Sequence, residues 1–264
     1  MIFNVLMYAM MVYMIIRIIL MNGIRKKNNY ITDLMQSVSD SAVFNEKADK
    51  LEELYAKDTQ FINEINVFRL WEQALNERYV VFQKTVEGLD LTKLIRNTNK
   101  GRTIEEVPFF YLLQTVPNIL YGNHNEEMRL LLKNKTDEVK DLISDQMTWQ
   151  ISEANAAMYA GEEDKAVSVY ENILNGDYEN MKYARNMIGI YKKICAAMLT
   201  KYYQDRDPAK AEELKEDVKY FYEMNIGKRW LKNIGVEVPE PVEETEEENT
   251  EEEPQETDGE ENKE

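Results

Sequence analysis

The segment 153-EANAAMYAGEEDKAVSVYENIL-174 decides the fold that we predict for this chain. Ala154 and Ala157 lie three residues apart, on one face of a predicted helix. Gly161 is placed to end that helix, and Ala166 and Tyr170 lie four residues apart on the next one. Small side chains let two antiparallel helices approach closely, and the tyrosine fills the space that the alanine leaves. The segment therefore predicts a helical hairpin.

This pattern resembles one tetratricopeptide repeat, which uses small residues, glycine, alanine and an aromatic residue at similar spacings. The resemblance covers about one repeat, from Ala154 to Leu174. It departs from the family pattern at Gln150 and Glu153, where the family favours Trp and Leu, and at Tyr178, where it favours Pro. The resemblance implies stacked hairpins with a concave face that holds peptides or partner helices.

The spacing of apolar residues is helical through most of residues 45–234, which we predict to form one body. Asn45 is placed to cap the helix of 45-NEKADKLEELYAKD-58, and a similar face returns in residues 61–82. A short strand competes with helix only at 78-RYVVFQKTV-86. The predicted fold class is therefore all-α, with an irregular solenoid of helical hairpins similar to tetratricopeptide repeats.

The apolar stretch 107-VPFFYLLQTVPNILY-121 is treated separately, because its composition suggests a second membrane segment. It is too short to cross a bilayer comfortably, and Pro108, Gln114, Pro117 and Asn118 interrupt it. Two interpretations remain, a core helix and an exposed groove for a partner.

The N-terminus is predicted to be a transmembrane anchor in residues 1–22, with Ile2–Met21 crossing the bilayer. As a helix, these 20 residues would cover about 30 Å, the thickness of the hydrocarbon layer. The basic residues that set its orientation are Arg17, Arg25, Lys26 and Lys27. All lie toward the C-terminal side, which predicts a single-pass protein of the cell membrane with a cytoplasmic body. A buried core helix and a cleaved signal peptide are the alternatives, and residues 23–44 are assigned to a juxtamembrane segment.

The C-terminal residues 235–264 are predicted to form a disordered acidic tail. From Glu237 to Glu264 there are 15 acidic residues and a single lysine, so this segment carries −14 of the chain's net charge of −17. It has no aromatic residue and too few apolar ones to offset the entropy cost of ordering. It serves as a solubilising extension or as an electrostatic contact for basic partners.

No catalytic, cofactor-binding or metal-binding residue is predicted. His124 is the only histidine and lies in a polar loop, and Cys195 is the only cysteine and is flanked by apolar residues. The body lacks the net positive charge that nucleic-acid binding requires, so no nucleic-acid partner is expected. We predict a membrane-tethered, non-enzymatic scaffold that binds an unknown protein partner. An exported, membrane-anchored binding or structural stalk is the alternative.

Overall fold

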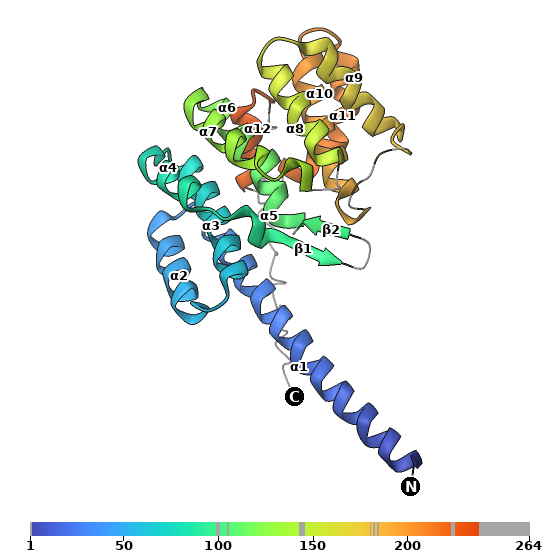
Figure 1. The fold of residues 1–264 in the computed structure, drawn as a ribbon. Coiled ribbons are helices and arrows are strands. Elements are labelled where there is room, and N and C mark those ends of the chain that lie inside the picture. The colour runs from blue at the N-terminus through green and yellow to red at the C-terminus, as the bar shows by residue number, and fades with distance from the viewer. Residues whose placement is uncertain are drawn as a thin grey trace, which may run out of the picture.

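The computed structural model describes residues 2–98, 101–104, 106–142, 146–179, 181, 183, 185–222 and 225–237. Within them the chain is helical apart from one β-hairpin (Figure 1). The first half contains α1 (Ile2–Gln36), α2 (Ser41–Leu54), α3 (Thr59–Leu75), α4 (Tyr79–Gly88), η1 (Leu91–Leu94), β1 (Ile95–Thr98), β2 (Gly101–Ile104), α5 (Glu106–Phe110), η2 (Tyr111–Thr115), α6 (Val116–Gly122), α7 (Glu126–Asp137) and η3 (Lys140–Leu142). The second half contains α8 (Gln146–Tyr159), α9 (Glu163–Asn175), η4 (Arg185–Met187), α10 (Ile188–Tyr203), α11 (Pro208–Tyr222) and α12 (Asn225–Asn233).

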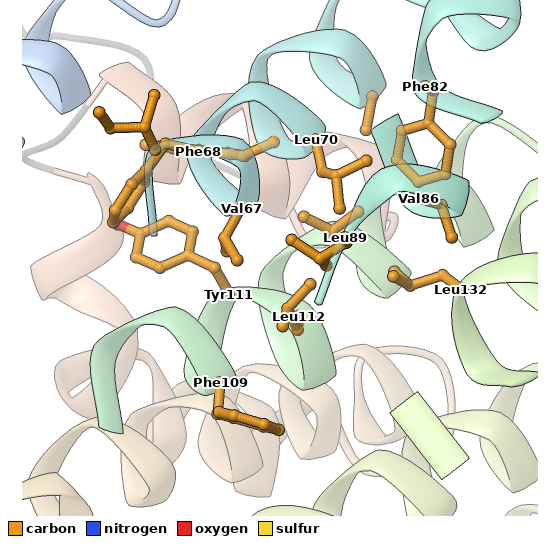
Figure 2. Close-up of a cluster of buried hydrophobic side chains, with 14 of the residues drawn as sticks. Val67, Phe68, Leu70, Phe82, Val86, Leu89, Phe109, Tyr111, Leu112 and Leu132 are labelled. Atoms are coloured by element: carbon orange, nitrogen blue, oxygen red, sulfur yellow. The ribbon is translucent and has the colours of Figure 1, made fainter. Parts of the chain in front are cut away.

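The first half of the chain encloses a hydrophobic cluster that we call the N-terminal core, formed by buried residues between Ile31 and Trp149. Helix α3 lies at its centre, because α3 packs against α2, α4, η2 and α6. Figure 2 shows part of this core, with side chains from α3, α4 and η2 directed into one space: Val67, Leu70, Phe82, Val86 and Leu112. Side chains on opposite sides of α3 are buried, because neighbouring elements cover the helix on more than one side. A helix in such a position is apolar around most of its circumference.

The second half encloses the C-terminal core, formed by buried residues between Met147 and Val236. Here the helices stack in chain order: α8 packs against α9, α9 against α10, and α10 against α11. This is the helical-hairpin packing that the sequence predicted, and it is compatible with a protein of helical repeats. Helix α12 then turns back and packs on α6, so the two cores are in contact. Val236 is 3% exposed, and residues 238–264, which hold most of the predicted tail, lie outside the described part of the chain.

The competition between strand and helix in residues 78–86 is resolved in favour of helix. Residues 79–86 belong to α4, in which Phe82 and Val86 are buried. The two strands are β1 and β2, which pair antiparallel with Ile95 opposite Ile104. Asn45 also does not cap α2, because the helix begins at Ser41 and the side chain of Asp40 accepts hydrogen bonds from two backbone N–H groups.

The predicted transmembrane anchor is contradicted. No helix in the described ranges is both long enough and apolar enough to cross a membrane, so the single-pass placement with a cytoplasmic body is corrected as well. Helix α1 does not end at Met21, where the predicted anchor ended, but continues as one helix of 35 residues to Gln36. That helix therefore combines the apolar segment with a polar, basic one, and Leu34 near its end is fully buried in the N-terminal core. The structure does not describe most of the side chains of residues 1–20.

The basic residues that we predicted to set the orientation of the anchor all lie on α1. Arg17, Arg25 and Lys26 are exposed on α1. Lys27 forms an ion pair with Asp58, the residue that caps α3, and lies 5.3 Å from the ring centre of Phe61. Partial burial raises the pKa of Asp58, but hydrogen bonds from Lys27 and from the Phe61 N–H outweigh it, so the pKa is lowered overall. Lys27 therefore joins α1 to the start of α3.

One carboxylate is fully buried in the N-terminal core. Glu72 of α3 is 0% exposed and accepts hydrogen bonds from Ser41, from Asn76 at 3.2 Å and from Arg78 at 3.2 Å to each carboxylate oxygen. A buried carboxylate needs such partners, because the desolvation of an unpaired charge is costly. The ion pair with Arg78 thus holds the start of α4 against α3.

We predict that Arg78→Met destabilises the protein by about 2 kcal/mol, because it leaves a buried carboxylate without its cation. This is less than the roughly 3–5 kcal/mol of fully buried pairs, since the Arg78 side chain is 36% exposed. The matched control is Arg206→Met, which removes an arginine paired with the half-exposed Glu163 and should cost less than about 1 kcal/mol. The measurement is urea unfolding of the full chain, and equal midpoints for the two variants would contradict the assignment.

Candidate functional site

The hairpin of α8 and α9 contains the residues that the sequence singled out for repeat packing. Ala154 and Ala157 of α8 and Ala166 of α9 are all buried. Gly161 lies in the turn with a φ of +82°, a left-handed conformation that favours glycine, and its neighbour Glu162 donates a backbone hydrogen bond to Ala157. Tyr170 is fully buried. The structure therefore brings these five residues together in one hairpin.

Tyr170 also belongs to a chain of buried hydrogen bonds that the sequence did not reveal. Its hydroxyl donates to Asn155 Oδ1 at 2.6 Å, and Asn155 Nδ2 donates to Gln114 Oε1 at 3.1 Å. Gln114 Nε2 then donates to the carbonyl oxygen of Thr148 at 2.7 Å. All four residues are at most 2% exposed. This polar chain joins η2 of the first half to α8 and α9 of the second.

The protonation state of Tyr170 suits this role. Burial raises the pKa of its hydroxyl well above the ordinary value, with smaller contributions from Cys195 and two neighbouring tyrosines. The hydroxyl therefore keeps its proton at neutral pH and remains a hydrogen-bond donor to Asn155. The amide of Asn155 uses both of its ends, one as acceptor and one as donor, so its orientation is fixed by the polar chain.

The helix that carries Gln114 is widened at this point. Residues Tyr111–Thr115 form a single π-helical turn, η2, and the backbone N–H of Val116 donates to Tyr111 O, five residues earlier. Pro117 follows at the start of α6 and has no N–H to donate to the preceding turn. Turns of this kind are frequent at functional sites, because they change the direction in which side chains point.

A cavity of about 430 Å³ lies beside η2, between the two halves of the chain, and we call it the interunit cavity. Its walls come from α1, α3, α5, η2 and α6 on one side and from η4, α10, α11 and α12 on the other. Five of the lining residues are aromatic: Trp71, Phe110, Tyr111, Phe221 and Trp230. This volume falls within the roughly 300–1,000 Å³ of small-molecule pockets.

The described wall of the interunit cavity has no charged side chain but is not wholly apolar. None of the 16 described residues that line it has a charged side chain. Three of them contain a buried polar atom with no hydrogen-bond partner: Trp71 Nε1, Trp230 Nε1 and Asn118 Oδ1. Such atoms are rare in folded proteins, since each has lost water without gaining a partner.

One glycine is required for the wall on the C-terminal side. A Cβ at Gly227 of α12 would lie 2.8 Å from the Cα of Phe221 and would also meet its carbonyl oxygen. Only glycine allows this close approach of α12 to α11. The approach places Phe221 and Trp230 side by side, with ring centroids 4.8 Å apart, at the cavity.

Residues with catalytic chemistry are not gathered at the cavity. Cys195 on α10 is fully buried, and burial raises the pKa of its thiol far above the ordinary value, so the thiol stays protonated. His124 is exposed in the turn before α7. In the ranges that the structure describes, no group of three or more His, Cys, Asp and Glu side chains is arranged to hold a metal ion.

Sequence reasoning found the hairpin but missed the interunit cavity. Trp71 and Trp230 are 159 positions apart, and no local spacing indicates that they share a wall. The one usable signal was the polar interruption of 107–121, where Gln114 and Asn118 stand among apolar residues. That stretch forms α5, η2 and α6, whose buried side chains belong to the N-terminal core, and several of its residues line the cavity.

No protein-family model matches the chain, and no curated protein or solved structure matches it significantly.

We predict that Tyr170→Phe lowers the free energy of unfolding by about 1–3 kcal/mol, because it leaves Asn155 Oδ1 buried without its donor. Tyr203→Phe is the matched control, since its hydroxyl contacts Glu171 and Lys210 at a half-exposed site and its loss should cost less than about 1 kcal/mol. Thermal unfolding of both variants tests this expectation. A control variant that is destabilised as much as Tyr170→Phe would remove the evidence for a special role of the polar chain.

Proposed function

We propose that this protein is a non-enzymatic binding protein whose ligand occupies the interunit cavity. The observation that carries the proposal is the cavity itself, which has a volume of about 430 Å³ and is lined by residues from both halves of the chain. Small-molecule sites in helical proteins commonly lie between packed units and combine an apolar wall with a few polar groups. The interunit cavity has both features.

The wall supports binding of an apolar group. Aromatic rings contribute large apolar surface with few rotatable bonds, so they lose little entropy when a ligand binds. Met35 and Met187 also line the cavity, and methionine side chains adapt readily to the shape of a ligand. The rigid rings and the adaptable thioethers together suit a site that takes up an apolar molecule.

A second candidate is the protein-interaction role that we predicted from the sequence. It is supported by the sequential packing of α8, α9, α10 and α11, which is compatible with a helical-repeat protein. We infer that this stack is similar to tetratricopeptide repeats and that its surface binds a protein segment. Helices α10 and α11 belong to the stack and also line the interunit cavity, so dye binding tests the cavity and a separate protein-binding measurement tests the surface of the stack.

We predict that Ile190→Trp abolishes binding of the neutral apolar dye Nile red or weakens it at least tenfold. Ile190 of α10 lines the cavity and is half-buried, so a larger ring at this position occupies the space of the ligand. Leu130→Trp is the matched control, because Leu130 on α7 is 43% exposed and does not line the cavity. Dye fluorescence titrations of the full chain provide the measurement.

Comparing the Ile190→Trp and Leu130→Trp variants also distinguishes dye bound in the cavity from dye bound to other apolar surface. Met21 and Ile24 on α1 are 48% and 60% exposed, and dye bound there would be insensitive to Ile190→Trp. If Ile190→Trp unfolds, Ile194→Phe gives a smaller enlargement of the same wall. Unchanged dye binding by a folded Ile190→Trp or Ile194→Phe variant would refute the cavity as the binding site.

A further inference from the structure

We infer that the ligand of the interunit cavity is an uncharged, ring-containing molecule that bears a hydroxyl group. This inference rests on the proposed function and names the class of ligand. Three features of the wall carry it: the lack of charged side chains among the described lining residues, the aromatic rings, and the polar atoms that have no partner.

The first feature disfavours a charged ligand. A carboxylate or an ammonium group that enters an apolar cavity loses its hydration and must gain an opposite charge or several hydrogen bonds in exchange. The described wall offers no opposite charge. Gln114, one of the polar residues of the wall, already uses its amide nitrogen for Thr148 and its amide oxygen for Asn155. A neutral ligand avoids this cost.

The second feature favours a ring. Trp71 and Tyr111 lie with ring centroids 4.7 Å apart on the N-terminal side, and Phe221 and Trp230 lie 4.8 Å apart on the C-terminal side. Two pairs of rings on facing units offer flat apolar surface to a ligand between them. Aromatic surfaces of this kind pack well against another ring, either offset and parallel or edge to face.

The third feature favours a hydroxyl group. The indole N–H groups of Trp71 and Trp230 are donors, whereas Asn118 Oδ1 is an acceptor, and none of these atoms has a partner in the protein. A hydroxyl group accepts one hydrogen bond and donates another, so it can pair with either kind of atom. Each of these atoms has almost no exposed surface, so a ligand reaches one only by displacing a side chain of the wall.

The experiment compares three probes with the same ring system: naphthalene, 2-naphthol and 2-naphthoate. At neutral pH the first is apolar, the second is a neutral alcohol and the third is charged. We expect 2-naphthol to bind the full chain about three- to tenfold more tightly than naphthalene, the gain of one or two hydrogen bonds. We expect 2-naphthoate to bind at least about tenfold more weakly than 2-naphthol.

The chain contains three tryptophans, which provide an internal control. Each has a buried indole nitrogen without a hydrogen-bond partner, but only Trp71 and Trp230 line the interunit cavity. In ¹⁵N-labelled protein, 2-naphthol should shift the indole N–H signals of these two residues and leave that of Trp149 unchanged. Trp230→Phe should reduce the advantage of 2-naphthol over naphthalene, whereas Trp149→Phe should preserve it.

The outcomes distinguish this inference from the proposed function. If Ile190→Trp abolishes Nile red binding but 2-naphthoate binds as tightly as 2-naphthol, the cavity binds ligands and the inference about charge is wrong. Equal affinity for naphthalene and 2-naphthol, or a shift of Trp149 alone, overturns the inference about the hydroxyl group. If no probe binds and Nile red is insensitive to both cavity-filling variants, the proposed function itself fails.

Discussion

The hydrogen bond between Asn155 Nδ2 and Gln114 Oε1 is the interaction on which the arrangement of the two halves depends. Both residues are buried, so neither amide can exchange its partner for water when the halves separate slightly. The bond also has a fixed direction, because Tyr170 and Thr148 occupy the remaining positions of the polar chain. Apolar contacts alone would allow η2 to slide along α8, whereas this chain of hydrogen bonds permits one register.

That register has consequences for the cavity. Gln114 and Tyr111 both belong to the π-helical turn η2, and both line the interunit cavity. When Gln114 is held by Asn155 and Thr148, the position of the turn is fixed, and with it the ring of Tyr111 against Trp71. On the opposite wall, the close approach of Gly227 to Phe221 fixes α12. These contacts therefore set the positions of Tyr111 on one wall and of Phe221 on the other.

The sequence predicted what depends on local spacing and missed what depends on distant pairing. Ala154 and Gly161 indicate a hairpin because their effects act on neighbouring turns, and the stacked helices of the second half agree with it. The anchor is contradicted because no helix in the described ranges is both long enough and apolar enough to cross a membrane. The apolar window also did not show where the helix ends, and α1 continues to Gln36. Trp71 and Trp230 share a wall only through the tertiary fold.

The interunit cavity is partly open to solvent, so it is a cleft between the two halves and not a closed void in a core. The apolar side chains that line it lose part of the free energy that full burial would provide. The three unpaired polar atoms of its wall add to that cost. Places where a sequence departs from good packing and from hydrogen-bond satisfaction together are more often functional than accidental. A ligand that fills the space and pairs those atoms binds the folded state alone, so its binding free energy adds to the stability of the fold.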